Sequence, residues 1–155
     1  MNRVGFRKAI SGSASISLDS QVIIYHLEDI TPYSALTEDI LSQIIIHRRH
    51  CNLCALTIIE IMVKPIISKR DTAVLLFDQF LNSIPRTSIL PVDRKVAFRA
   101  ARLRAEYNLK TPDAIILATA ILSNTSCFIT NDFEFKKVDP NGTGTRIVFM
   151  DDYLA

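Results

Sequence analysis

The sequence predicts an α/β fold, a three-layer sandwich in which helices cover both faces of a central, mostly parallel sheet of four or five strands. Short apolar runs of strand length alternate along the chain with longer stretches of helical periodicity. Strands that follow one another through helices pair in parallel, with the helices packed on the two faces of the sheet. The 155 residues, 48% of them apolar, suffice for one domain with a full core.

The first half of the chain begins with a lead-in that ends in Gly-Ser-Ala-Ser, and we expect residues 1–14 to be a flexible extension. The single domain is then expected to span residues 15–155. Its first predicted elements are a strand at Ile16–Leu18, a short helix at Val22–Leu27, a helix at Tyr33–Arg49, a strand at Asn52–Leu56 and a helix at Thr57–Val63. Pro65 is expected to stop the last of these, because the residue before a proline disfavours helical geometry.

The second half continues the same alternation. Its predicted elements are a helix at Lys69–Asn82, a strand at Ser88–Pro91, a helix after Asp93, a helix at Asp113–Leu122 and strands at Phe128–Thr130 and Arg146–Met150. Asp93 is a favourable N-cap residue. Thr111-Pro112 has the pattern of a capping hydroxyl followed by proline at the first helical position. The helix that follows is apolar on nearly every side, which indicates that it is buried.

Composition narrows the class of protein. No apolar stretch approaches the roughly 20 residues that a membrane-spanning helix needs, and the amino terminus lacks the apolar segment of a secretory signal. We therefore expect a cytoplasmic protein without a membrane partner. Cys51 and Cys54 have CxxC spacing, which occurs in redox and zinc sites, but the motif enters a predicted strand and Cys127 supplies no second pair. Buried strand residues are the better interpretation.

Four acidic residues stand where a predicted strand ends or a predicted helix begins: Asp19, Glu60, Asp113 and Asp132. In an open α/β sheet, ligands bind outside the carboxyl ends of the strands. Carboxylates from distant parts of the chain that meet there form an oxygen-rich site for a hard divalent cation. Each residue also has an ordinary alternative, as a helix cap, a solvent-facing helix residue, a first-turn charge or a turn residue, so their joint placement carries the prediction.

With these motifs, the chain resembles the PIN-domain ribonucleases, and among them the VapC-type toxins of toxin–antitoxin pairs, from about Ser15 to Met150. The motifs that carry the resemblance are Leu18-Asp19-Ser20-Gln21, Thr57 with Glu60, Pro112-Asp113-Ala114 and Thr130-Asn131-Asp132-Phe133. The last two together are fairly specific, and the first two are weak alone. Gln21 departs from the family, which usually has asparagine there, so the positioning of Asp19 is less secure.

The resemblance implies a PIN-like fold and a metal-dependent endoribonuclease that hydrolyses RNA phosphodiester bonds with Mg²⁺ or Mn²⁺. It implies that Asp19, Glu60, Asp113 and Asp132 are the catalytic residues and metal ligands, with Asp19 and Asp113 as the principal ones. Four polar residues would orient these carboxylates: Ser20, Thr57, Thr130 and Asn131. It also implies an RNA substrate, a small antitoxin protein as a partner and a homodimer.

Cations are concentrated in one stretch of the chain. Between Arg94 and Lys110 there are six basic residues against one acidic residue, Glu106. The candidates for RNA binding are Arg94, Lys95, Arg99, Arg102 and Lys110. For any one of them alone, a solvated helix face is the ordinary explanation.

Two other classes of function remain as alternatives. One is a catalytically silent PIN-like domain that binds RNA or a protein partner. The other is a phosphoryl-transfer domain of the receiver or haloacid-dehalogenase type, which also has an aspartate after the first strand. The phosphatase pattern requires a second aspartate where this chain has Gln21, and the receiver pattern requires paired acids before its first helix and a lysine after a late strand. Neither pattern is convincing here.

Overall fold

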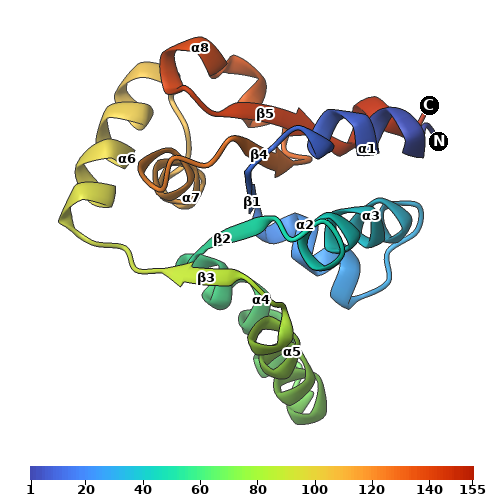
Figure 1. Cartoon of the computed structure of the whole chain (residues 1–155). Coiled ribbons are helices and arrows are strands. Elements are labelled where there is room, and N and C mark those ends of the chain that lie inside the picture. The colour runs from blue at the N-terminus through green and yellow to red at the C-terminus, as the bar shows by residue number, and fades with distance from the viewer.

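A computed structural model describes all 155 residues and contains a five-stranded parallel sheet with helices on both faces (Figure 1). The strands are β1 (Ser15–Leu18), β2 (His50–Cys54), β3 (Thr87–Leu90), β4 (Cys127–Thr130) and β5 (Arg146–Phe149). Their order in the sheet is β3-β2-β1-β4-β5, and every neighbouring pair is parallel. The predicted fold class is confirmed. The central position of β1 places its carboxyl end in the middle of one sheet edge.

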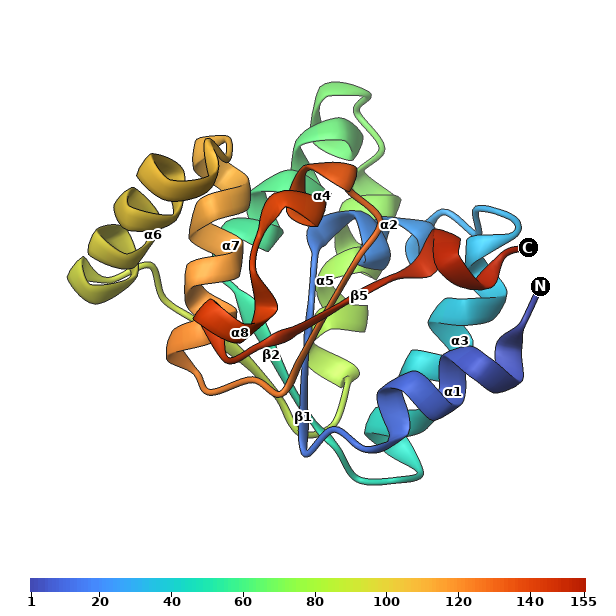
Figure 2. The same ribbon diagram turned by 90° about the horizontal axis from the view of Figure 1, so that it is seen from above.

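The helices divide between the two faces of the sheet (Figure 2). The larger core contains residues from α1 (Arg3–Ser11), α2 (Ser20–Leu27), α3 (Tyr33–Ile45), α4 (Leu56–Ile67) and α5 (Asp71–Ser83). The smaller core contains residues from α6 (Arg94–Tyr107) and α7 (Thr111–Leu122). The remaining short elements are η1 (Phe133–Lys137), α8 (Pro140–Thr143) and η2 (Met150–Tyr153).

Both faces of β4 are covered, and all four of its residues are buried. In β4, Cys127 and Ile129 pack into the larger core while Phe128, between them, packs into the smaller one. Successive strand residues point to opposite faces of a sheet, so a strand between two helical layers is apolar throughout. Cys51, Cys54 and Cys127 are free and buried, which confirms their interpretation as strand residues. None of the helices has the length and apolar character that crossing a membrane requires.

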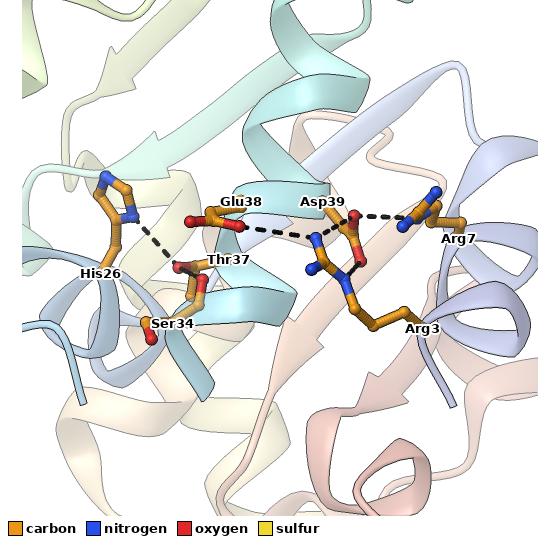
Figure 3. A network of polar contacts seen from close by, with 7 residues as sticks. All are labelled: Arg3, Arg7, His26, Ser34, Thr37, Glu38 and Asp39. Atoms are coloured by element: carbon orange, nitrogen blue, oxygen red, sulfur yellow. Dashed lines mark hydrogen bonds and ion pairs between the residues drawn. The ribbon is translucent and has the colours of Figure 1, made fainter. Parts of the chain in front are cut away.

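The prediction that residues 1–14 form a flexible extension is wrong. They contain α1, whose Phe6 and Ile10 lie one helical turn apart and are completely buried in the larger core. Ion pairs also hold this helix on α3 (Figure 3): the Nε atoms of Arg3 and Arg7 each lie 2.9 Å from a carboxylate oxygen of the buried Asp39. The domain therefore includes its amino-terminal helix.

The two ends of the chain meet beside α1 (Figure 2). The backbone N–H of Asn2 donates to the carbonyl of Tyr153 at 2.7 Å, and the rings of Phe6 and Tyr153 pack edge to face with centroids 5.3 Å apart. The side chain of Asn2 caps α1 by accepting from the N–H of Gly5. These contacts fix α1 against both α3 and the carboxyl-terminal η2.

Several predicted element boundaries move. The helix predicted to reach Arg49 ends at Ile45, and Arg48 takes a left-handed conformation (φ 56°) that turns the chain toward β2. The helix α4 continues through Pro65 to Ile67. Proline removes only one backbone donor. The ring of Pro65 is buried, and its carbonyl accepts a hydrogen bond from the N–H of Arg70.

The two predicted helix caps have different outcomes. Asp93 caps α6 as predicted, since its carboxylate accepts from the N–H of Val96 at 2.9 Å. Thr111 does not cap α7: it is the first helical residue, Pro112 the second, and Lys110 occupies the cap position without a side-chain hydrogen bond. At the end of the chain, Met150 belongs to η2 and not to β5.

Candidate functional site

Asp19 follows the last residue of β1 directly and begins the turn into α2. Its side chain is 7% exposed, and burial raises the pKa of its carboxyl group from 3.8 to about 6. The hydroxyl of Thr130 and the backbone N–H of Ser20 favour the charged form, while repulsion from Asp113 and Glu60 adds to the increase. A cation beside this carboxylate would stabilise its charged form and offset the cost of its burial.

Thr130 fixes the position of Asp19 from the neighbouring strand. Leu18 pairs with Ile129 in the sheet, so the residues after them, Asp19 and Thr130, leave the two strands side by side. The N–H of Asp132 donates to the Thr130 hydroxyl oxygen at 3.0 Å, and the same hydroxyl donates to Asp19 Oδ2 at 2.6 Å. An ionised carboxylate can only accept hydrogen bonds, so the threonine proton is directed to Asp19.

Asp113 is the third residue of α7 and is half-buried. Burial raises the pKa of its carboxyl group, repulsion from Asp132, Glu60 and Glu134 adds to the increase, and Lys110 opposes it. The position in the first turn of a helix would by itself favour the charged form. Its Oδ2 atom is buried and has no hydrogen-bond partner. Such an oxygen is costly to leave unpaired, which indicates a missing partner at this point.

Glu60 enters from the opposite layer, on α4, and is half-buried. Thr57, one turn earlier, is 1% exposed and accepts a hydrogen bond from the hydroxyl of Ser20 at 3.3 Å. This contact joins α4 to the start of α2, next to Asp19. The hydroxyls of Ser20 and Thr57 bond to each other and to none of the four carboxylates, so their predicted orienting roles stay a prediction.

The side chains of Asp132 and Asn131 make hydrogen bonds that hold the chain after β4 in place. One carboxylate oxygen of Asp132 accepts from the N–H of Glu134 at 2.8 Å and caps η1. Asn131 bonds to none of the four carboxylates: its amide donates to the Tyr25 hydroxyl at 3.3 Å, and its carbonyl accepts from the N–H of Asp151 at 2.9 Å. Asn131 thus fixes the chain after β4 and leaves the orientation of Asp19 to Thr130.

Glu134 is the acidic residue that sequence reasoning missed. It acts on the charge of Asp113 and receives a hydrogen bond from Lys137 at 2.6 Å, which lowers the pKa of Glu134. Its place two residues after Asp132, just beyond the fourth motif, is the signal that could have revealed it.

The four predicted carboxylates are neighbours, yet they are not a preassembled ligand set. Repulsion from Asp113 and Glu60 contributes to the raised pKa of Asp19, and repulsion from Asp132 and Glu60 contributes to that of Asp113, so the four carboxylates lie within electrostatic reach of one another. At the same time, no group of three or more His, Cys, Asp or Glu side chains is arranged to hold a metal ion. The residues nevertheless fit a hard divalent cation, because all the donors are oxygens and Asp113 Oδ2 lacks a partner.

The buried Asp19 predicts an unusual pH dependence of stability in the absence of metal. The folded protein holds this proton up to pH 6 or so, whereas the unfolded chain releases it near 3.8. The free energy of unfolding should therefore fall as the pH rises between these values, by an amount on the order of 3 kcal/mol. Urea unfolding in EDTA at pH 4 to 7 measures this, with Asp19→Asn as the variant that lacks the titration. Parallel pH profiles for the two proteins would contradict the prediction.

Four of the five predicted RNA-binding residues lie together on α6. Arg94, Lys95, Arg99 and Arg102 line one hollow of about 710 Å³, which also includes Asp93, Phe98 and Leu122. Lys110 lies apart from them, directly before α7, where its charge acts on Asp113 and Glu134. The basic and acidic groups therefore occupy different parts of the α6–α7 layer.

Comparison with known proteins agrees with this fold. The fold is similar to that of VapBC2 from Rickettsia felis bound to a promoter DNA fragment, with a TM-score of 0.65, 18% identity and coverage of 86% of this chain and 97% of that chain. It is also similar to DNA-bound VapBC from Salmonella typhimurium, with a TM-score of 0.61, 20% identity and coverage of 87% of this chain and 97% of that chain. VapBC-5 from Mycobacterium tuberculosis is a third similar structure, with a TM-score of 0.60, 22% identity and coverage of 88% of this chain and 99% of that chain.

At these identities the likeness establishes the fold alone. A search of curated protein sequences gives no match. The family model described as PIN domain matches residues 16–140, from the start of β1 to the start of α8. Since this range covers well over half of the sequence, the chain belongs to the PIN-domain family.

Proposed function

We propose that the chain is a Mg²⁺- or Mn²⁺-dependent endoribonuclease that hydrolyses RNA phosphodiester bonds and is the toxin of a toxin–antitoxin pair. One observation carries the proposal: the buried, unpartnered Oδ2 of Asp113 lies in a cluster with Asp19, Glu60 and Asp132. Membership in the PIN-domain family supports the nuclease assignment. The toxin assignment rests on the likeness to VapBC structures.

The proposed roles follow from the environment of each residue. Asp19 and Asp113 would be the principal metal ligands, because burial and like charges make them gain most from a cation. Glu60 and Asp132 would complete the ligand set, and Thr130 would keep one oxygen of Asp19 in place. The chemistry contributed by a bound Mg²⁺ or Mn²⁺ is positive charge beside the reacting phosphate and a lower pKa for water.

RNA would be held by the cations of α6 and by Lys110. The acidic cluster repels phosphate when it holds no metal, so attraction has to come from elsewhere on the surface. Arg94, Lys95, Arg99 and Arg102 form no ion pair within the chain, which leaves their charges available. Arginine is suited to this task because its planar guanidinium group contacts phosphate oxygens in pairs.

A protein partner is proposed on separate grounds. Four side chains of α4 are 47–75% exposed although they are large and apolar: Ile59, Val63, Ile66 and Ile67. An exposed apolar surface of this kind is typical of protein–protein contacts. The solved VapBC structures are described as toxin–antitoxin systems. We assign this surface, with the apolar faces of α3 and α5, to contacts with an antitoxin and with a second copy of the chain.

A catalytically silent PIN-like domain is the second candidate. It is favoured by Gln21 at the position where the resemblance implies asparagine, and by carboxylates that are not prearranged for a metal. Such a domain would keep the basic hollow and the apolar surface but would not hydrolyse RNA.

Cleavage of a mixed pool of structured RNAs separates the two candidates. We expect fragments with Mg²⁺ or Mn²⁺ and intact RNA with EDTA. Folded protein that cuts nothing with either metal would favour the silent domain. Calorimetric titration with Mg²⁺ and Mn²⁺ measures metal binding separately from cleavage. It would detect an ion at the acidic cluster even in a protein that does not hydrolyse RNA.

A further inference from the structure

The hollow on α6 combines cations with an exposed aromatic ring. Helices α6 and α7 lie side by side in both views of the fold (Figure 1, Figure 2), and the hollow opens where the start of α6 meets the end of α7. Phe98 is 60% exposed and Leu122 is 44% exposed, so the hollow has an apolar surface. A single exposed apolar residue is common on protein surfaces. The surroundings of Phe98 distinguish it.

Positive charge surrounds this ring without being neutralised. The guanidinium carbon of Arg94 lies 5.4 Å from the centroid of Phe98. Arg99 and Arg102 line the same hollow, and neither they nor Arg94 has an acidic partner. The one carboxylate present, that of Asp93, is occupied in capping α6. The hollow therefore attracts anions while offering a flat, apolar face.

We propose that the hollow binds an unpaired stretch of RNA, with a base stacked on Phe98 and the adjacent phosphates on Arg94, Arg99 and Arg102. A base within a duplex has both faces covered by its neighbours, so only an unpaired base presents a face to an aromatic ring. The inference rests on the proposed ribonuclease function and adds that the substrate is single-stranded at this point.

The hollow also has a defined distance from the acidic cluster. Leu122 lies two and a half turns after Asp113 along α7, which is roughly 14 Å along the helix axis and on the opposite side of the helix. A single strand of a few nucleotides spans this distance. An unpaired base held at Phe98 would thus lie a few nucleotides or more from a bond that is cut beside Asp113.

Binding of labelled single-stranded RNA of mixed sequence tests the inference. It is measured in Mg²⁺ with Asp113→Asn protein, so that no substrate is consumed. Adding Phe98→Ala should weaken binding roughly 5- to 150-fold, the range for the loss of one stacked base. Phe98→Leu keeps an apolar side chain without the flat ring and should also weaken binding. Val4→Ala shortens an exposed apolar side chain on α1, which has no part in the hollow or in the proposed partner surface, and should leave the affinity unchanged.

RNA with a missing base locates the stacking partner. In a series of oligonucleotides that each lack one base, the loss of one particular base should weaken binding to the protein that retains Phe98. The loss of the same base should not weaken binding further in Phe98→Ala. Duplex RNA should bind with an affinity that is insensitive to Phe98. Equal binding of single-stranded RNA by both proteins, with affinity still falling as salt rises, would overturn the stacking inference and leave the proposed function standing.

Two other outcomes would overturn the inference for different reasons. No RNA binding by any of these proteins would remove the proposed function as well. A change from dimer to monomer in Phe98→Ala, seen by sedimentation, with unchanged RNA affinity would assign the hollow to contact between two copies of the chain. Circular dichroism of each variant confirms that the exposed substitutions leave the fold intact.

Discussion

Replacing Asp113 with asparagine is expected to abolish metal-dependent RNA cleavage while the protein remains folded. The substitution keeps the size of the side chain but removes the charge beside Asp132 and Glu60 and neutralises the unpartnered oxygen. Removing a residue that only orients a metal ligand typically costs up to ~100-fold in affinity or activity, so losing a principal ligand should cost more. Initial rates on the same RNA, with saturating Mg²⁺, measure the effect.

Stability measurements separate this loss from unfolding. Without metal, Asp113→Asn should be at least as stable as the original protein, because it relieves repulsion in a half-buried acidic cluster. With Mg²⁺, the melting temperature of the original protein should rise, since an ion that binds only the folded state stabilises it. That of the variant should not rise. The matched control is Asp78→Asn, which removes one exposed carboxylate on α5 and should retain full cleavage. Equal cleavage by Asp113→Asn would contradict the assignment of the site.

The sequence could predict that the acidic residues come near one another because that argument depends only on the order and direction of the strands. Residues that closely follow parallel strands meet at one sheet edge. Asp19, directly after β1, and Asp132, two residues after β4, could therefore be placed together without knowing any side-chain contact. The hydrogen bond from Thr130 to Asp19 follows from the same register. What the sequence could not supply was the burial of each carboxylate, which depends on how closely α4 and α7 approach the sheet. The pKa of Asp19 is a consequence of that packing.

Local signals were misjudged where they compete with tertiary packing. Pro65 has the usual mark of a helix end, yet α4 passes through it because the ring is buried. Phe6 and Ile10 have helical spacing, but the polar and small residues around them favoured an extension. The Phe98 ring is a different case: its spacing on α6 places it beside the basic residues, but only the structure shows that it is exposed.

Truncating Phe6 to alanine is expected to lower the free energy of unfolding by about 3–5 kcal/mol, the usual cost for a fully buried phenylalanine. Phe6 is completely buried and packs against Tyr153, so its removal opens a cavity between α1 and the end of the chain. The loss is a large part of the roughly 5–15 kcal/mol that stabilises a domain. Urea unfolding measures it, and Val4→Ala, in the same helix but 77% exposed, is the matched control. Similar losses in the two variants would show that α1 is not part of the core.

The same helix should matter to activity only through stability. It lies outside the residues that the family model covers, and none of its side chains contacts the acidic cluster. Phe6→Ala protein kept cold enough to stay folded should therefore cleave RNA with the metal dependence of the original protein, and lose activity on warming as it unfolds. Deleting α1 should be more damaging than Phe6→Ala, because it also removes Ile10 from the core and the ion pairs of Arg3 and Arg7 with Asp39.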